Sequence, residues 1–397
     1  MLLNVERASR LMDESGLDGL VATTLPNIYY LSGLWSSSLA LFPLDAQVYA
    51  VAPRERLAEP VLVVPTGDLD TVPDCFPGVR AVNYGCFYRE VAEGVDLSAG
   101  EARLRDLAID REPRTDAIEA LSAALEQAAL GNKTIGLDER SVDPALASKL
   151  QRRFPSMSIR KASSIFKQIR MVKTKDEIDR LRAAVRVTEE AIRRTMLIAE
   201  EGTTELQMAK EFERALVDQG AELIFKLLRI GRHTAFGQAR PTDTPLKKGD
   251  RIWLDVGCKY EGYSSDIMRT FAFGDVGERA RRYYEAILKG QERGLQTAMP
   301  GVKAKEVYHA TVEQVREAGI PHFRRHNVGH GMGIHLYDPP MLAPGDETVL
   351  EEGMVLNIEP PYYEIGTGAL GVEDTFLVTK DGSELLTSIS RKLEVLQ

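Results

Sequence analysis

The spacing of apolar residues in the first 160 positions alternates between helical and strand-like periods. A helix is predicted from its cap Asn4 to Gly16, with an apolar face formed by Val5, Ala8, Leu11 and Met12. Short apolar runs between turn residues predict buried strands, whereas longer runs with a period near 3.6 predict helices. The strands are expected at 19–23, 47–53, 60–65 and 134–137, and further helices at 115–129 and 144–153. Residues 27–33 are expected to turn into irregular structure, and the whole region is predicted to be an α/β layer domain.

A different order of elements is predicted for the rest of the chain. Apolar residues at helical spacing predict a long helix over 174–201, preceded by an extended basic passage over 163–174. The domain boundary is expected near this passage, with one domain at 1–165 and a second at 166–397. In the second domain, helices are expected at 205–219, 278–298 and 303–318, and strands at 223–230, 251–258 and 263–273. The order helix–helix–strands occurs twice, which indicates an α/β domain built from two related halves.

Composition and charge restrict the class of protein. The 397 residues suffice for two domains with sizeable cores, and 44% hydrophobic with 27% charged residues is typical of globular proteins. No apolar run is long enough to cross a bilayer, and the first residues lack the apolar core of a secretory signal. A formal charge of −9 argues against a nucleic-acid binder. The 3 scattered cysteines form neither a CxxC pair nor a disulfide framework, so we expect a reducing, cytoplasmic setting.

Two aspartates lie in apolar, strand-like sequence, where a carboxylate is costly. If the strands of WLDVGCKYEGYSSDIMRTF turn at Tyr260-Glu261, Asp255 lies directly opposite Asp266. Like charges that face each other destabilise a strand pair, and burial of both carboxylates costs several kcal/mol or keeps one protonated. A divalent cation between them removes this conflict.

A second pair of carboxylates has the same character. Glu359 and Glu373 lie in strand-like sequence, and the glycines within 366–368 can turn the chain so that the two side chains face each other. Between the acidic pairs lies His330, flanked by glycines that let the backbone approach closely. Each residue alone is more often an ordinary surface or loop residue, but the five together predict a metal centre. Four carboxylates and one imidazole match two divalent ions, with Mn2+ favoured and Co2+, Fe2+ or Zn2+ as alternatives.

These residues resemble the pita-bread metallopeptidases, a family that contains methionine aminopeptidase, aminopeptidase P and prolidase. The resemblance is carried by four segments: Asp255-x10-Asp266-x2-Arg269-Thr270, Gly329-His330-Gly331-x-Gly333, Asn357-Ile358-Glu359-Pro360 and Glu373-Asp374-Thr375. The amino-terminal region is similar to the creatinase/prolidase amino domain, with NIYYLSG and RMVKTKDEIDRLRAA at the expected places. The resemblance covers nearly the whole chain. It favours the prolidase and aminopeptidase P branch, because methionine aminopeptidase lacks such a domain.

The resemblance implies a role for each of the five residues. Asp255 would bind one metal ion, His330 and Glu359 would bind the other, and Asp266 and Glu373 would bridge both. The family uses such ions to activate a water that attacks a carbonyl group, and Glu359 would help to move protons.

Three positions depart from the family pattern. The two helper histidines of the peptidases are replaced by Gln238 and Tyr337, and an arginine that is common near the last ligand is replaced by Gly371. Gln and Tyr still carry hydrogen-bonding groups that can orient a peptide or stabilise an oxyanion. Gln238 and Tyr337 are therefore candidate catalytic residues beside Glu359.

The resulting hypothesis is a metal-dependent hydrolase that cleaves Xaa-Pro bonds, as an Xaa-Pro dipeptidase (prolidase) or an Xaa-Pro aminopeptidase. The replaced helpers leave one alternative, a non-peptidase member of the same fold that acts as a small-molecule amide hydrolase or a sulfonium lyase. A catalytically dead binding module is disfavoured, because such proteins usually lose metal ligands as well. The expected partners are a short peptide or small-molecule substrate and, by resemblance, a second copy in a homodimer; neither nucleic acid nor membrane is expected.

Overall fold

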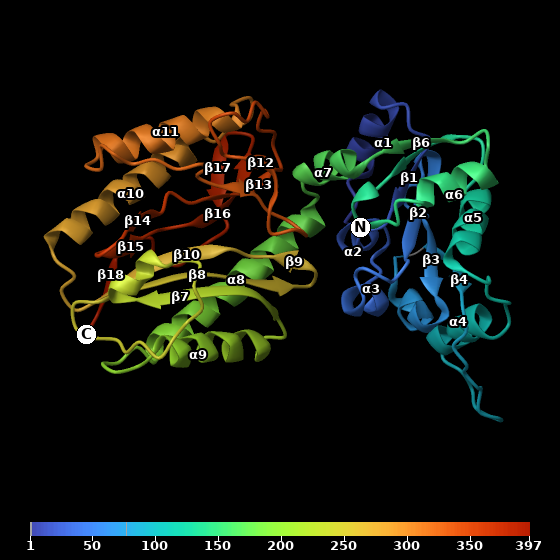
Figure 1. The fold of residues 1–397 in the computed structure, drawn as a ribbon, viewed down its shortest axis with the longest axis horizontal. Coiled ribbons are helices and arrows are strands. Elements are labelled where there is room, and N and C mark those ends of the chain that lie inside the picture. Colours follow the sequence, from blue (N-terminus) through green and yellow to red (C-terminus); the bar gives the residue numbers. More distant parts are fainter. Residues whose placement is uncertain (1, 77) are drawn as a thin grey trace. The chain divides into compact units, whose positions relative to one another are not determined.

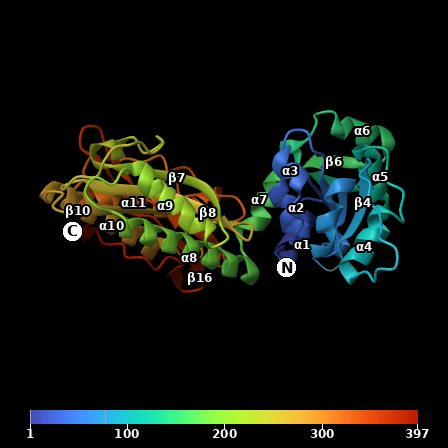
Figure 2. The ribbon, with the colours of Figure 1, turned by 90° about the horizontal axis from the view of Figure 1, so that it is seen from below.

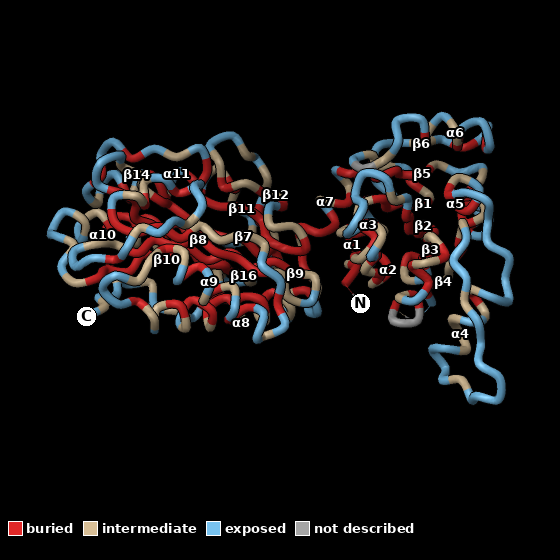
Figure 3. The backbone as a smooth tube through the Cα atoms, turned by 60° about the horizontal axis from the view of Figure 1, so that its bottom comes forward, coloured by how far each residue is buried: buried red, intermediate tan, exposed pale blue. Residues whose placement is uncertain are grey.

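The computed structural model describes residues 2–76 and 78–397. The chain divides into two compact units, residues 1–170 and residues 171–397, and both combine helices with strands (Figure 1). The α/β class predicted from the sequence is therefore confirmed. Burial is concentrated in the strands of both units (Figure 3). Among the described residues, no helix combines the length and the apolarity that a bilayer crossing requires.

The first unit is built around a six-stranded sheet with the strand order β4-β3-β2-β1-β5-β6. The strands are β1 (Gly19–Ala22), β2 (Tyr49–Pro53), β3 (Val61–Pro65), β4 (Arg80–Tyr84), β5 (Thr134–Leu137) and β6 (Ser158–Lys161). β1 pairs antiparallel with β2 and parallel with β5, which in turn runs parallel to β6. All four residues of β1 are buried, as expected for a short apolar strand inside a sheet.

Helices of the first unit cover this sheet. They are α1 (Val5–Glu14), α2 (Leu25–Ser32), α3 (Ser37–Leu41), α4 (Ala99–Ala108), α5 (Ala117–Gln127), α6 (Leu146–Arg153) and α7 (Ser163–Met171), with the 3-10 helices η1 (Arg54–Arg56), η2 (Thr66–Asp74) and η3 (Glu139–Ser141). Asn4 caps α1 by accepting a hydrogen bond from the backbone N–H of Arg7, as predicted. The predicted apolar face of α1 is wrong at Val5, which is 40% exposed because it lies in the first turn, outside the buried stripe.

Two segments of the first unit are helical, contrary to expectation. Residues 27–33 form most of α2, which has a proline in its first turn and ends at Gly33 with a φ of 78°. Five of these seven residues are buried and none is exposed, so their sequence has no polar face that reveals a helical period. The passage expected to be extended forms α7, whose buried Phe166 and Ile169 lie three residues apart on one face.

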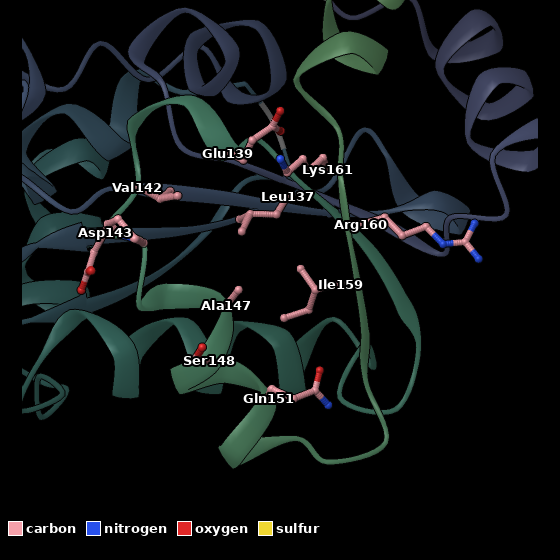
Figure 4. A pocket seen from close by; sticks show the side chains of 11 residues that line it. Leu137, Glu139, Val142, Asp143, Ala147, Ser148, Gln151, Ile159, Arg160 and Lys161 are labelled. Atoms are coloured by element: carbon pink, nitrogen blue, oxygen red, sulfur yellow. The ribbon is translucent and has the colours of Figure 1, made fainter.

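A cavity of about 660 Å3 opens on the first unit beside η3, α6 and the edge strand β6 (Figure 4). Leu137, Val142 and Ile159 give it an apolar floor, and charged side chains such as Glu139 and Lys161 line its rim. All of its lining residues belong to the first unit, so it contains none of the predicted metal ligands.

The second unit contains two sheets with the strand orders β18-β10-β8-β7 and β12-β11-β13-β16-β17, and a β14-β15 hairpin. Its helices are α8 (Lys175–Leu197), α9 (Glu205–Val217), α10 (Glu278–Thr297) and α11 (Ala304–Glu317), with the 3-10 helix η4 (Gly231–Ala235). Its strands are β7 (Glu222–Ile230), β8 (Arg251–Tyr260), β9 (Tyr263–Ser264), β10 (Ile267–Phe273), β11 (His330–Gly331), β12 (Asp338–Met341), β13 (Val355–Ile358), β14 (Tyr362–Glu364), β15 (Gly368–Leu370), β16 (Asp374–Thr379), β17 (Gly382–Leu385) and β18 (Glu394–Leu396). The predicted repetition of helix–helix–strands is observed along the chain.

The two helix pairs of the second unit pack on different sheets. α8 and α9 contact β8 and β7 of the first sheet, whereas α10 contacts β13 and β17 of the second. Figures 1 and 2 show the two helix pairs on opposite sides of the strands. α8 begins at a capping box between Thr174 and Glu177, and Leu181, Val185 and Ile192 are buried along one stripe, as predicted.

The predicted register of the hairpin around Asp255 is wrong. Asp255 lies opposite Met268, not opposite Asp266. The turn is formed by Glu261 and Gly262, with φ values of 47° and 82°, because a two-residue hairpin turn favours positive φ at both positions and glycine at the second. The turn is therefore one residue later than expected. Asp255 and Asp266 remain on one face of the strand pair, as diagonal neighbours.

Candidate metal centre

The five predicted ligands all lie at strands of the second unit. Asp255 lies within β8, Asp266 directly precedes β10, and His330 begins β11. β13 and β16 pair as far as Ile358 and Asp374, so Glu359 directly follows β13 and Glu373 directly precedes β16 at the same end of this strand pair.

Three of the five side chains converge closely. Ligand atoms of Asp266, His330 and Glu373 all lie within 4.8 Å of one another. His330 Nε2 lies 3.5 Å from Asp266 Oδ2 and 3.9 Å from Glu359 Oε1. Asp255 is the diagonal neighbour of Asp266 on the same face of the β8–β10 strand pair. The structure thus brings the candidate ligands together, with Glu359 and Asp255 next to the central three.

Buried ligand atoms in this cluster have no partner. Asp266 Oδ1, His330 Nε2 and Glu373 Oε2 are buried and accept or donate no hydrogen bond within the described part of the chain. An unpaired buried polar atom is costly, and three that point into one place are rare unless a ligand completes them. Two carboxylate oxygens and an imidazole nitrogen are donors that divalent transition-metal ions accept, so these residues fit a metal ion.

The electrostatics of the cluster also favour a cation. Burial raises the pKa of Asp266 to about 7 and that of Glu359 to about 8. Burial, followed by the charge of Asp266, raises the pKa of both Asp255 and Glu373. Burial lowers the pKa of His330, which keeps its imidazole neutral at pH 7. Without a cation, the carboxylates repel one another and hold protons that a metal ion would displace.

Hydrogen bonds from neighbouring residues orient the ligands. His330 Nδ1 lies 3.1 Å from the carbonyl oxygen of Gly331, so that an Nδ1–H tautomer leaves the Nε2 lone pair free for a metal ion. Asn357 Nδ2 donates to Glu373 Oε1 at 2.7 Å, and Asn357 Oδ1 accepts from the Thr375 hydroxyl at 2.7 Å. These contacts fix which Glu373 oxygen remains available.

The buried guanidinium of Arg269 holds the backbone at Glu373, the last candidate ligand along the chain. It donates to the backbone carbonyl of Glu373 and to the carboxylate of Asp374. Gln291 and Thr387 also donate to Asp374, at 2.9 and 2.6 Å. The Arg269 and Asp374 side chains are each only 1% exposed, so this network holds the start of β16 in a fixed position.

Of the candidate helpers, Tyr337 lies at the cluster. Its ring stacks on the His330 imidazole, with 3.6 Å between ring centroids and 20° between planes. Tyr337 remains 53% exposed, so a substrate can reach part of this residue. Partial burial and then the Glu359 charge raise its pKa, so the hydroxyl is a neutral donor at pH 7.

Gln238 and Gly371 have different surroundings. Gln238 is exposed in the turn after η4, and the structure records no contact between it and the five candidate ligands. A Cβ atom at Gly371 would lie 2.2 Å from Met268 Sδ and 3.1 Å from Trp253 Nε1. These neighbours fill the space that a side chain at 371 would need.

Two further side chains border the cluster and have no distinct sequence signal. The Arg325 guanidinium lies over the Tyr363 ring at 5.5 Å, and that ring meets Trp253 edge-on at 5.8 Å. Arg325 Nε is buried and has no hydrogen-bond partner among the described residues. These residues come together only through the β14–β15 hairpin, so no local pattern predicts their meeting.

Comparison with known proteins agrees with this architecture. Residues 179–380 match metallopeptidase family M24, and residues 4–73 and 87–172 match the creatinase/prolidase N-terminal domain. The Xaa-Pro dipeptidase of Pyrococcus furiosus is 31% identical over 263 residues, which cover 66% of this chain and 75% of that relative.

Solved structures show the same fold over almost the whole chain. The prolidase from Pyrococcus furiosus is 26% identical, with a TM-score of 0.74 over 96% of this chain and 99% of that chain. The X-Pro aminopeptidase from Thermotoga maritima shares the fold, with 24% identity and a TM-score of 0.79 over 98% of this chain and 100% of that chain. The chain therefore belongs to metallopeptidase family M24, with a creatinase/prolidase domain in its first unit and the pita-bread fold in its second.

Proposed function

We propose that this protein is an Xaa-Pro peptidase that holds two divalent metal ions with Asp255, Asp266, His330, Glu359 and Glu373. The observation that carries the proposal is the set of buried, unpartnered ligand atoms on Asp266, His330 and Glu373. Membership of a metallopeptidase family implies divalent metal ions. The related Xaa-Pro dipeptidases supply the substrate class.

Each residue of the cluster would have its own role in the cleavage of the peptide bond. Divalent ions, when bound, would polarise the scissile carbonyl and lower the pKa of a water. Asp266 and Glu373 would bridge, with Asp255 on one side and His330 and Glu359 on the other. Glu359 would hold a metal ion and, as the resemblance implies, would help to move protons. The Tyr337 hydroxyl would donate a hydrogen bond to the developing oxyanion.

The finer assignments follow from ligand chemistry and resemblance. Mn2+ suits a site dominated by carboxylate oxygens. We further propose a homodimer, as the resemblance implies, and a cytoplasmic location, in which Cys75, Cys86 and Cys258 stay reduced. The non-peptidase alternative depends on the replaced helpers Gln238 and Tyr337, and the named relatives do not favour it.

A substrate panel tests the proposal. Ala-Pro, Ala-Ala, Ala-Pro-Ala and simple N-acyl amides are assayed with the metal-loaded enzyme, and Asp266→Asn serves as the matched control that keeps the side-chain shape. We expect cleavage of peptides with proline after the scissile bond, little cleavage of Ala-Ala, and none by Asp266→Asn. Cleavage of the amides without cleavage of either proline peptide would contradict the proposal.

A further inference from the structure

The segment between β7 and β8, residues 231–242, borders the candidate metal centre through two aromatic rings. A Cβ atom at Gly237 would lie 2.8 Å from the Tyr363 ring and 3.2 Å from the Trp253 ring, so the backbone of the segment rests directly on both. Trp253 lies two residues before Asp255 in β8 and therefore on the same face of the strand as this candidate ligand, and the Tyr363 ring packs edge-on against Trp253. The segment is thus part of the wall around the site.

Both ends of this segment are held by one buried carboxylate, that of Glu205 at the start of α9. Its Oε1 accepts a hydrogen bond from the backbone N–H of Ile230 at 2.9 Å. Its Oε2 accepts from the backbone N–H and the hydroxyl of Thr242, both at 2.8 Å. Glu205 is fully buried, whereas Phe236 and Gln238 between the two ends are exposed. One carboxylate therefore holds both ends of a segment in which Phe236 and Gln238 are exposed.

The charge of Glu205 is balanced by a second buried group. Arg229 Nη1 lies 3.1 Å from Glu205 Oε2 and also donates to the carbonyl of Arg240 within the segment. Desolvation largely offsets the attraction within a buried ion pair. Such a pair is better explained by the arrangement that it specifies than by the stability that it adds.

We propose that Glu205 is a positioning residue that fixes residues 231–242 as a wall of the substrate site, with Phe236 and Gln238 facing the substrate. The inference rests on the proposed function, because the wall has a role only if a substrate binds beside it. Glu205 acts through the segment and not on the reacting groups.

Glu205→Gln tests the proposal. Glutamine keeps the length but has only one acceptor end, so either Ile230 or Thr242 faces a donor, and Arg229 loses its counter-charge. We expect amide hydrogen exchange within 231–242 to become about tenfold faster, and KM for Ala-Pro to rise about tenfold, the equivalent of about 1.4 kcal/mol. Turnover should fall less than KM rises, and metal content should stay unchanged.

Glu189→Gln is the matched control. Glu189 is 1% exposed, accepts hydrogen bonds from the backbone and hydroxyl of Ser388 and from the backbone of Ile389, and lies 3.6 Å from Arg193. It therefore makes the same kinds of bonds to a different segment. This variant should loosen residues 388–389 and leave amide exchange within 231–242 at the wild-type rate. Because Ile389 and Ser390 accept hydrogen bonds from Arg269, exchange within 231–242 and not KM is the control readout.

A milder variant keeps the test informative if Glu205→Gln folds poorly. Thr242→Val keeps the backbone bond to Glu205 and removes the hydroxyl bond, together with the hydroxyl's bonds to Thr244, so it should raise KM in the same direction by a smaller factor. The proposal is overturned if residues 231–242 exchange at the wild-type rate in Glu205→Gln, or if they loosen while KM stays constant. A wild type that cleaves no Xaa-Pro peptide would contradict the proposed function, and the exchange experiment would still decide whether Glu205 holds the segment.

Discussion

The imidazole of His330 is fixed from two directions. Its Nδ1 lies at hydrogen-bonding distance from the carbonyl oxygen of Gly331, and its face stacks on the ring of Tyr337. Nε2 is left directed toward Asp266 and Glu359, without a hydrogen-bond partner among the described residues. The ring and the hydroxyl of Tyr337 can therefore be tested separately. The ring holds the candidate ligand His330 in place, and the hydroxyl is the proposed hydrogen-bond donor.

The hydroxyl of Tyr337 is tested by Tyr337→Phe, which keeps the stacked ring. Loss of one oxyanion donor typically lowers turnover about a hundred- to a thousand-fold. We expect a fall of this size on an Xaa-Pro dipeptide, with a small change in KM and unaltered metal content. Tyr337→Ala, which removes the ring as well, should also weaken metal binding. A Tyr337→Phe enzyme with wild-type turnover would rule out the hydroxyl as a donor.

The amide of Asn357 is predicted to strengthen metal binding through Glu373. Asn357→Leu keeps the branched shape of the side chain but removes the hydrogen bonds to Glu373 Oε1 and to the carbonyl of Asp266. Loss of an outer hydrogen bond of this kind typically weakens metal affinity about 10- to 100-fold, which competition with a chelator measures. Thr375→Val leaves the bond between Asn357 and Glu373 in place and removes the bond that orients Asn357, together with a 3.5 Å bond to the carbonyl of Asp266, so its effect should be smaller. Equal affinities for wild type and Asn357→Leu would contradict this role.

The candidate ligands lie on or next to strands, and the packing of these strands leaves the ligands little freedom to move. Thr270 Oγ1 in β10 donates to the carbonyl of Gly371 and accepts from its N–H, at 3.0 and 2.9 Å. The backbone N–H of Glu373 donates to the carbonyl of Met268 at 3.0 Å. These bonds hold the segment before β16 tightly against β10. One contact between strands therefore fixes the positions of both proposed bridging ligands, Asp266 and Glu373.

The tight contact predicts the cost of a side chain at 371. Gly371→Ala would place a methyl group against Met268 Sδ, and overpacking of this kind typically costs about 1–3 kcal/mol. In a Met268→Ala background the added methyl group has room, so its cost should be clearly smaller. The free energy of unfolding in urea, measured for both single variants and the double variant, checks this. Additive effects would contradict the proposed contact.

Local sequence predicts an element well where burial leaves one polar face. α8 follows from its period, because one side of the helix is buried and the other is not, whereas β8 follows from its continuous apolar run. α2 does not, since its buried residues cover most of its circumference and mask the period. The β8–β10 register also could not be read from apolar spacing, because it depends on which residues of the turn adopt positive φ.

The candidate ligands are predictable for a related reason. A carboxylate within an apolar strand conflicts with its buried surroundings, and the amino-acid sequence alone shows this conflict. The Asn357 bond to Glu373 and the contact between Arg325 and Tyr363 depend on how separate strands and hairpins pack. Nothing in their local sequence distinguishes these side chains from ordinary surface or core residues.

In the whole molecule, all five candidate ligands belong to the second unit, so metal binding is linked to the stability of that unit. Buried carboxylates that repel one another destabilise the metal-free fold, and an ion that binds only the folded state stabilises it by mass action. A hundredfold excess over the dissociation constant adds about 2.7 kcal/mol. Metal and protons therefore compete for the same groups.

The pH dependence of metal-free protein follows from the raised pKa values. Asp266 and Glu359 have pKa values of about 7 and about 8 when folded, against roughly 4 for exposed carboxyl groups. Between these limits the folded state binds more protons than the unfolded state, so stability falls as pH rises from about 4 to 8. Thermal unfolding of the protein in the presence of a chelator, at several pH values between about 4 and 8, measures this fall in stability. A melting temperature that rises with pH, or equals that of the metal-loaded protein throughout, would contradict a shared buried cluster.

The central claim, an Xaa-Pro peptidase that depends on two divalent ions, is tested most directly by metal reconstitution. The protein is chelated and dialysed, Mn2+ is added stepwise, and proline release from Ala-Pro is followed at each step. We predict no release without metal and a rise that levels off near two ions per chain, with no recovery in Asp266→Ala, which lacks a bridging ligand. Full proline release by the metal-free protein would contradict the account.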